Sequence, residues 1–363
     1  MNKIKVLIID DSRLIHVLLE KVISSHEDII VIGNAYDGKE GVDLANSLSP
    51  DIIIMDIGMP RMDGLEAIEE IMDNKPTPII VFSGLSKKKI DLGFKAMELG
   101  AVDMIEKPEA ENLSSSTLEQ YLEEKLIKSI KTFADIKLIR RRKKKIITSL
   151  KAEKKPLALK ENKRNAAISN FPVIGIAAST GGPQTLKHLI EDLSARKVNA
   201  AIVIVQHIAE GFMNGFRDWL ALYSSLPVIL PKKGDSVEPY NIYVAPGEHH
   251  LIFDGNRRFS FLDSPPVQGI RPCADIMFSS LAETFKERAI AVVLTGMGSD
   301  GTQGLYKIKE NNGYIISQDE ESSLIFGMPK SAIETGLVDK ILNISEISQY
   351  LEKICNDKLA ELV

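Results

Sequence analysis

Short, almost wholly apolar runs recur along the chain, and most are followed by a segment whose apolar residues have helical spacing. The first such runs lie at 5–10, 51–56 and 78–84, with a weaker one at 101–108. Continuous apolar runs are typical of parallel strands that are buried on both faces, and their alternation with helices favours a doubly wound domain. The same alternation resumes at Phe171. The sequence therefore predicts an α/β protein with two doubly wound parallel-sheet domains.

A strongly basic segment separates the two regions. Between Lys131 and Arg164 there are 14 Lys and Arg residues but only 3 Asp and Glu, in a chain whose formal net charge is −5. We interpret this segment as a helical, basic linker, with contact to an acidic domain surface or to anionic lipid as alternatives. Nucleic acid binding is disfavoured because no aromatic residues alternate with the basic ones. The expected organisation is a first domain at 1–130, a linker at 131–170, a second domain at 171–350 and a C-terminal helix tail at 351–363.

Cysteine usage and hydropathy narrow the class of protein. The chain has only two cysteines, Cys273 and Cys355, and no CxxC spacing, which disfavours a disulfide framework or a zinc ribbon. The N-terminus runs straight into a strand-like segment and does not resemble a signal peptide. No apolar run approaches the ~20 residues that a membrane-spanning helix needs. We therefore expect a cytoplasmic protein.

Acidic side chains end the first strand-like runs of the first domain. Asp10 and Asp11 end one run, and Asp56 ends another. The carboxyl ends of strands in a doubly wound sheet meet at its switch point, where three carboxylates would repel one another and raise each other's pKa. Mg²⁺ relieves such repulsion, prefers oxygen ligands and often bridges carboxylate and phosphate. The sequence therefore predicts a magnesium site at these three residues.

Two further polar residues end the later runs of this domain. Ser83 is placed to donate to a phosphoryl oxygen, and Lys107 to supply a positive charge. Aspartates at strand ends also cap helices or form turns, as Asp11 would do for a helix that starts near Arg13. We favour the metal and phosphoryl site because five such groups are expected on the same side of the sheet.

Three apolar runs of the second domain each deliver a different reactive side chain. One ends at Ser179, the next at His207, and the third leads to Asp300. A serine hydroxyl needs a base to remove its proton, and imidazole suits that task near neutral pH when a carboxylate orients it. Convergence of these strand ends would bring a nucleophile, a base and an orienting carboxylate together.

Rival interpretations of these residues stay open at this point. Ser179 would belong to a phosphate-binding loop if the glycines were the signal, but "GIAASTGG" matches neither GxGxxG nor GxxxxGK[ST]. It is not GxSxG either, and the order Ser, His, Asp differs from that of α/β-hydrolases. His250 is the second candidate for the base, and Asp300 alternatively is a turn residue. Arg271 fits either a contact to substrate or a surface ion pair.

The first domain resembles the two-component receiver family. The segments "IIDDS", "MDIGMPRMDGLEAI", "FSGLS" and "GAVDMIEKP" match the family pattern in order. Met104 replaces the aromatic residue that the family usually has there, and so departs from its aromatic rotamer switch. The resemblance implies a flavodoxin-like fold with Asp56 as phosphoryl acceptor, Asp10, Asp11 and Asp56 as Mg²⁺ ligands, Ser83 as switch hydroxyl and Lys107 as phosphate partner.

The second domain resembles the chemotaxis protein-glutamate methylesterases. The segments "ASTGGP", "VQH", "YVAPGEHHL", "RPCADIMF", "LTGMGSDG" and "QDEESSLIFGMPKSA" occur in the family's order. The chain departs from the family at Ala177 (usually Gly), Ala209 (usually Pro) and Cys273 (usually Ser). The resemblance implies a Rossmann-like esterase domain with Ser179 as nucleophile, His207 as base, Asp300 as orienting carboxylate, and Thr180 and the backbone N–H of Met297 organising the site and the oxyanion.

Together, the two resemblances imply a phosphorylation-activated serine esterase. It would hydrolyse glutamyl γ-methyl esters, and deamidate glutamines, on methyl-accepting chemoreceptors, with a chemotaxis histidine kinase as phosphodonor. Mg²⁺ would be needed for phosphorylation and no cofactor for ester hydrolysis. Membrane contact would come through the receptors, with the basic linker as a second candidate. Two alternatives stay open: a non-catalytic, phospho-switched module that binds a receptor or scaffold, and an esterase or amidase for a substrate outside chemotaxis.

Overall fold

The computed structural model divides into two compact units, Met1–Leu150 and Lys151–Val363, which are described separately. It describes residues 3–84, 86–108, 115–134, 136 and 171–360. Most of the basic segment, at 137–170, therefore lies outside the described residues. No helix in these described ranges is both long enough and apolar enough to cross a bilayer.

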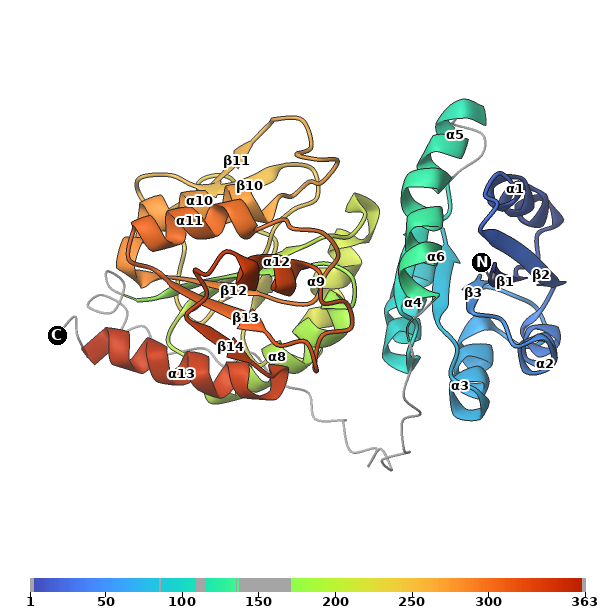
Figure 1. Ribbon diagram of the computed structural model, residues 1–363. Coiled ribbons are helices and arrows are strands. Elements are labelled where there is room, and N and C mark those ends of the chain that lie inside the picture. Colours follow the sequence, from blue (N-terminus) through green and yellow to red (C-terminus); the bar gives the residue numbers. More distant parts are fainter. Residues whose placement is uncertain (1–2, 85, 109–114, 135, 137–170, 361–363) are drawn as a thin grey trace. The chain divides into compact units, whose positions relative to one another are not determined.

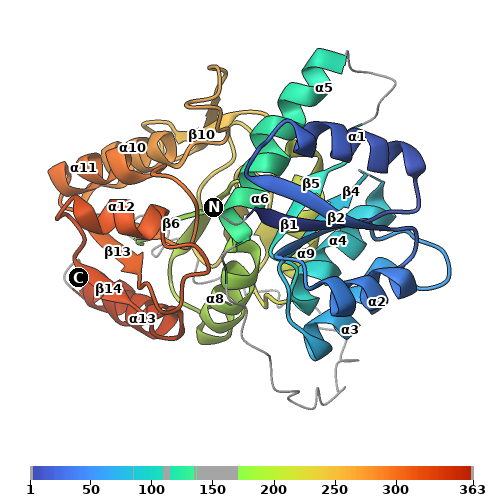
Figure 2. The same ribbon diagram turned by 45° about the vertical axis from the view of Figure 1, so that its right-hand side comes forward.

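The first unit is a five-stranded parallel sheet in the order β2-β1-β3-β4-β5. In Figure 2, α1 lies over one face of this sheet, and α2 and α3 lie side by side over the other. The strands are β1 (Ile4–Ile9), β2 (Ile29–Ala35), β3 (Ile52–Met55), β4 (Ile79–Ser83) and β5 (Asp103–Glu106). The helices are α1 (Arg13–Ser24), α2 (Gly38–Leu48), α3 (Gly64–Asn74), α4 (Lys87–Leu99), α5 (Ser115–Leu122), the π-helical turn η1 (Glu123–Ile127) and α6 (Lys128–Phe133).

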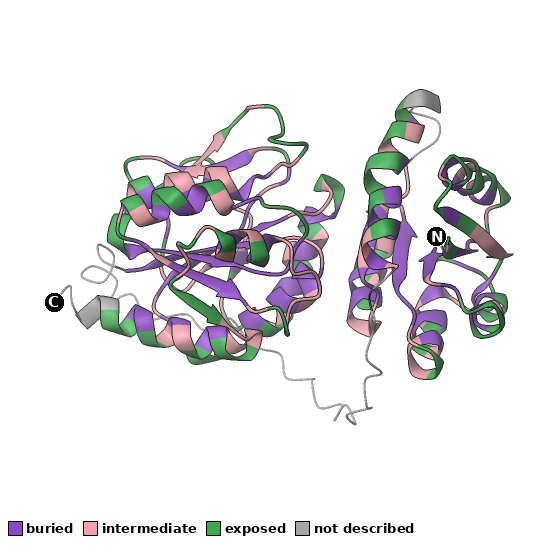
Figure 3. Ribbon diagram, viewed as in Figure 1, coloured by how far each residue is buried: buried purple, intermediate pink, exposed green. Residues whose placement is uncertain are grey.

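Burial explains why the apolar runs of this unit form the central strands. All four residues of β3 are buried, as are the last four of β1, so both faces of these strands are covered (Figure 3). The helix α3 begins with a capping box, in which Asp63 accepts the Glu66 N–H and Glu66 accepts the Asp63 N–H. The helical structure that follows β5 continues through Phe133, whose side chain is buried.

The second unit is a seven-stranded parallel sheet in the order β14-β13-β12-β6-β7-β9-β8. In Figure 1, α10 and α11 lie over one face of the sheet, and α8 and α13 lie over the other. Its strands are β6 (Val173–Ala178), β7 (Ala201–Gln206), β8 (Val228–Ile229), β9 (Ile242–Val244), β12 (Ala289–Val293), β13 (Tyr314–Gln318) and β14 (Lys340–Leu342). The helices are α8 (Gly182–Arg196), η3 (Glu210–Phe212), α9 (Met213–Ala221), α10 (Ala274–Phe285), η4 (Lys286–Arg288), α11 (Thr302–Glu310), α12 (Met328–Glu334) and α13 (Ile344–Ala360).

A separate antiparallel hairpin of β10 (His250–Phe253) and β11 (Phe259–Leu262) joins this unit's core. The core packs apolar side chains of α10, such as Phe278 and Leu281, with the buried residues of the central strands. Both units are thus parallel α/β sheets, as the sequence predicts. The strands β12, β6 and β7 are direct neighbours, so their carboxyl ends lie side by side at one edge.

Candidate functional site

An acidic cluster lies at the carboxyl ends of β1 and β3 in the first unit. The two strands are paired, with Ile9 opposite Met55, and the next residue of each is an aspartate. The carboxylates of Asp10, Asp11 and Asp56 lie within 4.8 Å of one another. Asp10 and Asp56 are buried and Asp11 is exposed, so the cluster is open to solvent on one side. Three oxygen donors of this kind suit a hard divalent cation.

The alternative role for Asp11 as a helix cap is wrong. Ser12, not Asp11, is the N-cap residue of α1, and its side chain makes no capping hydrogen bond. The Ser12 N–H instead donates to Asp10 Oδ1 at 3.0 Å. Asp11 is therefore left exposed beside the two buried aspartates.

Lys107 provides the positive charge of this cluster. Its Nζ lies 2.7 Å from Asp10 Oδ2 and 3.3 Å from Asp56 Oδ2. Burial raises the pKa of Asp10, and the charge of Asp56 adds to this, although the contact with Lys107 opposes both. The cluster therefore holds excess negative charge in a poorly solvated place, which a cation would stabilise.

Ser83 and Met104 complete the surroundings of this cluster. Ser83 ends β4, and among the described residues its buried Oγ has no hydrogen-bond partner. A buried hydroxyl without a partner is free to donate to a group that arrives at the site. Met104 is buried, and its sulfur packs against Gly93 of α4, where there is no side chain to displace it.

In the second unit, Ser179, His207 and Asp300 lie at the carboxyl-terminal edge formed by β6, β7 and β12. Ser179 directly follows β6, His207 directly follows β7, and Asp300 lies in the loop between β12 and α11. His207 Nε2 lies 2.8 Å from Asp300 Oδ2. Because a carboxylate only accepts, Nε2 carries the proton and Nδ1 is left as the basic nitrogen.

Asp300 is saturated with hydrogen-bond donors. Besides His207, it accepts from the N–H groups of Ala274 (2.7 Å), Asp275 (3.0 Å) and Gly301 (2.9 Å) and from Cys273 Sγ (3.0 Å). Burial alone would raise the pKa of Asp300, but the hydrogen bond and charge of His207, with the Ala274 N–H and the Cys273 thiol, outweigh it and lower the pKa to about 2. The carboxylate therefore stays ionised and fixed in orientation.

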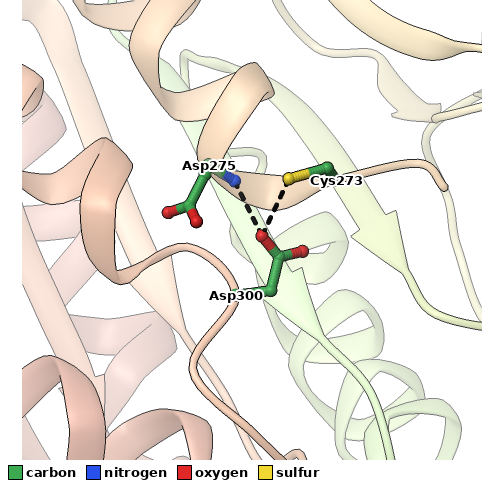
Figure 4. Close-up of side chains that lie close together, drawn as sticks. All are labelled: Cys273, Asp275 and Asp300. Atoms are coloured by element: carbon green, nitrogen blue, oxygen red, sulfur yellow. Dashed lines mark hydrogen bonds between the residues drawn. The ribbon is translucent and has the colours of Figure 1, made fainter. Parts of the chain in front are cut away.

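Cys273 and Asp275 belong to the same network, at the start of α10 (Figure 4). Burial, with the charge of Asp300, raises the pKa of the Cys273 thiol to about 12, so the thiol remains a donor. Asp275 gives Asp300 its backbone N–H, while its carboxylate turns aside and accepts the Gly304 N–H at 2.8 Å. Burial raises the pKa of Asp275 to about 6, and the charge of Asp300 adds to this. These three side chains are close enough to hold a metal, but the protonated, already bonded thiol fits a hydrogen-bond network instead.

Two glycines after Ser179 allow the chain to turn sharply into α8. Gly181 is the N-cap, with a left-handed φ of 77°, and a Cβ on Gly182 would lie 2.1 Å from Gln206 Oε1. The Gln206 side chain occupies the space beside Gly182, where its Nε2 donates to the carbonyls of Ser179 (2.9 Å) and His207 (3.1 Å). Gln206 thus ties the nucleophile strand end to the base strand end. Ser179 lies beside the N-terminal end of α8, where the helix dipole favours negative charge.

The loop after β12 packs directly against Ser179. The Ser179 N–H donates to Thr295 O at 3.1 Å, and a Cβ on Gly296 would lie 2.8 Å from the Ser179 Cβ. Thr295 Oγ1 in turn donates to Thr180 O at 3.0 Å. Met297 follows Gly296 in this loop, so Thr180 and Met297 both flank the nucleophile.

The other candidates from the sequence have different positions. His250 is fully buried, with Nδ1 3.1 Å from the Cys273 N and Nε2 3.3 Å from Pro265 O, so it is not the base. Arg271 has no ion pair in the described ranges, and its Nε is buried without a partner, which removes the surface-pair interpretation. Ala177 is fully buried in the core beneath Ser179. Ala209 has a φ of −59°, the value that proline would impose.

Sequence reasoning missed three supporting residues. Gln206, Thr295 and Asp275 hold the two loops and the carboxylate in place. None of them is both a reactive residue type and the last residue of an apolar run, which was the pattern used to select candidates. The signal that was present is position: Gln206 precedes His207, Thr295 precedes the Gly-Met-Gly turn, and Asp275 lies in the first turn of a helix.

Two family models match the chain, one in each unit. The model described as response regulator receiver domain matches residues 6–138, and that described as CheB methylesterase matches residues 174–351. Together they cover both of the sites described above.

Relatives match over nearly the whole chain. A protein-glutamate methylesterase/protein-glutamine glutaminase of Pyrococcus horikoshii is 37% identical over 97% of this chain and 94% of its own length. A protein of Syntrophomonas wolfei, named protein-glutamate methylesterase/protein-glutamine glutaminase 1, is 38% identical over 96% of this chain and 98% of its own length.

Among solved structures, the CheB methylesterase catalytic domain of Thermotoga maritima is 37% identical and covers 51% of this chain and 98% of that domain, with a TM-score of 0.49. The response regulator domain of Thermotoga maritima CheB is 35% identical and covers 38% of this chain and all of that domain, with a TM-score of 0.34.

Proposed function

The chain belongs to the CheB methylesterase family and carries a response regulator receiver domain, and from this premise we propose that it is a phosphorylation-activated protein-glutamate methylesterase and protein-glutamine glutaminase. The single observation that carries the catalytic part is the His207–Asp300 contact at the sheet edge where Ser179 lies. Its substrates would be glutamyl γ-methyl esters, and certain glutamines, on chemoreceptors.

In the first half of the reaction, Ser179 Oγ attacks the ester carbonyl carbon and His207 Nδ1 takes the hydroxyl proton. Asp300 stabilises the imidazolium that forms, because its carboxylate is ionised and fixed. The bond to methoxide then breaks, and His207 returns the proton so that methanol leaves. Ser179 is left as a γ-glutamyl ester.

In the second half, His207 Nδ1 takes a proton from water as the water oxygen attacks the acyl carbon. The bond to Ser179 Oγ breaks, the proton returns to the serine, and a glutamate carboxylate is released. With a glutamine substrate, ammonia leaves in place of methanol. These side chains supply the nucleophile and the proton transfers, so we propose that no cofactor takes part in hydrolysis.

Backbone N–H groups beside Ser179 would stabilise the tetrahedral oxyanion. Among the described hydrogen bonds, none is donated by the Thr180 N–H, which is adjacent to the nucleophile at the N-terminal end of α8. We assign the oxyanion to this group and to the Met297 N–H in the facing loop. One such donor is often worth ~3 kcal/mol in the transition state.

In the receiver unit, Asp56 would be the phosphoryl acceptor, with a chemotaxis histidine kinase as donor. Asp10, Asp11 and Asp56 would hold Mg²⁺, which neutralises charge on the transferring group. Lys107 would pair with the phosphoryl group, and the Ser83 hydroxyl, which has no hydrogen-bond partner among the described residues, would donate to it. Phosphorylation can activate the esterase only through a different effect on an active and an inactive state of the chain.

The same proposal implies which partners the protein binds and where in the cell it acts. Chemoreceptors would bring a cytoplasmic enzyme to the membrane, with the basic linker as a second candidate for lipid contact. No nucleic acid partner is expected. We propose a receiver at 1–130, a linker at 131–170, a methylesterase domain at 171–350 and a C-terminal tail at 351–363.

Methanol release from methylated receptor membranes tests the proposal. The wild-type chain should release methanol, faster with a phosphodonor, whereas Ser179→Ala should release none and Asp56→Asn should lose only the stimulation. Intact signalling in Ser179→Ala, with loss in Asp56→Asn, would favour the non-catalytic binding module instead. Hydrolysis of model esters without release from receptors would point to a substrate outside chemotaxis.

A further inference from the structure

His250 is a fully buried histidine that the proposed chemistry does not use. It starts β10, in the hairpin outside the main sheet. Its Nδ1 lies 3.1 Å from the backbone N of Cys273, and its Nε2 lies 3.3 Å from Pro265 O. A carbonyl only accepts and an N–H only donates, so Nε2 carries the proton and Nδ1 accepts. The two contacts therefore fix one neutral tautomer.

The peptide unit that His250 holds is the one that binds Asp300. Cys273 is the N-cap of α10, and its thiol and the next two N–H groups, of Ala274 and Asp275, all donate to Asp300. These three donors lie within three consecutive residues. A shift of the Cys273 backbone would move all of them together.

Loss of the His250 contact would leave the Cys273 N–H unsatisfied and would affect the start of α10 first. Cys273 is only 1% exposed, so an N–H without an acceptor there would lack water as well and would stay unsatisfied, which is unfavourable. The chain would relieve this by turning the Cys273 peptide, and so would move the donors away from Asp300. His207 would then lose its fixed carboxylate.

We propose that His250 is a positioning residue for the esterase reaction: by accepting the Cys273 N–H it fixes the start of α10, and through it the Asp300 carboxylate that orients His207. This role presupposes the proposed esterase function. His250 touches neither the serine nor the base in this scheme, and it acts only through Cys273.

Two amide substitutions in the full-length protein separate this role from simple filling of space. In His250→Asn the side-chain oxygen takes the place of Nδ1 and still accepts the Cys273 N–H. In His250→Gln the amide reaches the place of Nε2 and keeps the Pro265 contact, but no acceptor remains for Cys273. The matched control is His249→Gln, since His249 is the preceding residue and is partly exposed beside Asp263.

We expect His250→Gln to lower kcat on the order of 100-fold with little change in KM, as misplaced catalytic groups do. His250→Asn should stay within about fivefold of wild type, and His249→Gln within about twofold. A second readout needs no substrate: the downfield N–H proton resonance of the His207–Asp300 hydrogen bond, identified by its absence from His207→Gln. It should shift or vanish in His250→Gln and persist in His250→Asn.

Equal effects of the two amides, on kcat or on the resonance, would overturn the proposal, because they would show that the acceptor at Nδ1 is not what matters. Loss of folding in both variants, measured by circular dichroism, would also overturn it and assign His250 to stability alone. An inactive wild-type protein with the expected pattern of resonances would instead contradict the proposed function, and would support only the part of this proposal in which His250 fixes the Asp300 carboxylate against His207.

Discussion

The two acidic sites of this protein lie at the carboxyl-terminal edges of two parallel sheets, yet the pKa values of Asp10 and Asp300 are shifted in opposite directions. Burial raises the pKa of Asp10, which has a neighbouring carboxylate and few donors. Asp300 is also buried, but its donors lower its pKa to about 2. The carboxylates around Asp10 would still be stabilised by a cation, whereas Asp300 already has a full set of hydrogen-bond donors. The difference teaches that the donors around an aspartate at this edge of a sheet decide its role. With few donors it is suited to bind a cation, and with many it is suited to orient a histidine.

The largest expected effect is on the Asp300 site. Asp300→Asn should lower kcat for methanol release about 10⁴-fold, because the amide cannot stabilise the imidazolium of His207. The measurement is the initial rate with methylated receptor membranes, with phosphorylation of the same sample as the control for folding of the receiver. A loss below tenfold would mean that the two acidic sites do not differ in the way described.

Removal of Mg²⁺ should affect only the other site. With a chelator, phosphoryl transfer to Asp56 from a small phosphodonor should fall at least ~100-fold, because the single charge of Lys107 does not neutralise three carboxylates and an incoming phosphoryl group. The basal rate of methanol release by unphosphorylated protein should not change. A matching loss of basal esterase activity would show that a metal serves the second site as well.

Loss of a single donor to Asp300 should have a smaller effect. Cys273→Ala removes the thiol at 3.0 Å and should lower kcat about tenfold, the effect of one lost hydrogen bond to a charged group. Cys273→Ser keeps a donor and should recover most of the rate. If Ser and Ala behave alike, the donor count is not what distinguishes the two sites.

The smallest effect concerns stability near Asp275. Its folded pKa of about 6 lies above the ordinary 3.8, so the protonated carboxyl contributes stability below about pH 4 that is lost as the pH rises through 6. Asp275→Asn does not ionise, so its Tm relative to wild type should rise between about pH 4 and 6.5, by roughly 2–4 °C, and then level off. Glu334→Gln, which removes an exposed carboxylate, should show no such trend. If the Tm difference between Asp275→Asn and wild type did not change with pH, another group would be responsible for the pH dependence.

Much of the fold could be predicted because the evidence for it is local. The runs around Ile52–Met55 and Val173–Ala178 are apolar or glycine throughout, a pattern typical of parallel strands that are covered on both faces. The position of Ser179, His207 and Asp300 followed from the rule that parallel strands end at one edge. The roles of these residues remain predictions that the experiments above test.

The supporting shell could not be predicted in the same way. Three of the donors to Asp300 are backbone N–H groups, of Ala274, Asp275 and Gly301, which every residue except proline carries. Nothing in the side chains marks them. The sequence makes His250 a candidate base because histidine suits that task, but burial and its two hydrogen-bond partners give it another role.

The sequence by itself determined which reactive side chains end which strands, because strand burial and parallel order are encoded in runs of neighbouring residues. Only the tertiary structure decided that His207 meets Asp300 through Nε2, that the start of α10 supplies three further donors, and that Asp300 has a full set of donors while Asp10 does not. The physical reason is that the electrostatic environment depends on groups brought together from distant parts of the chain, and its strongest contributors here are burial and the contacts with His207 and Lys107.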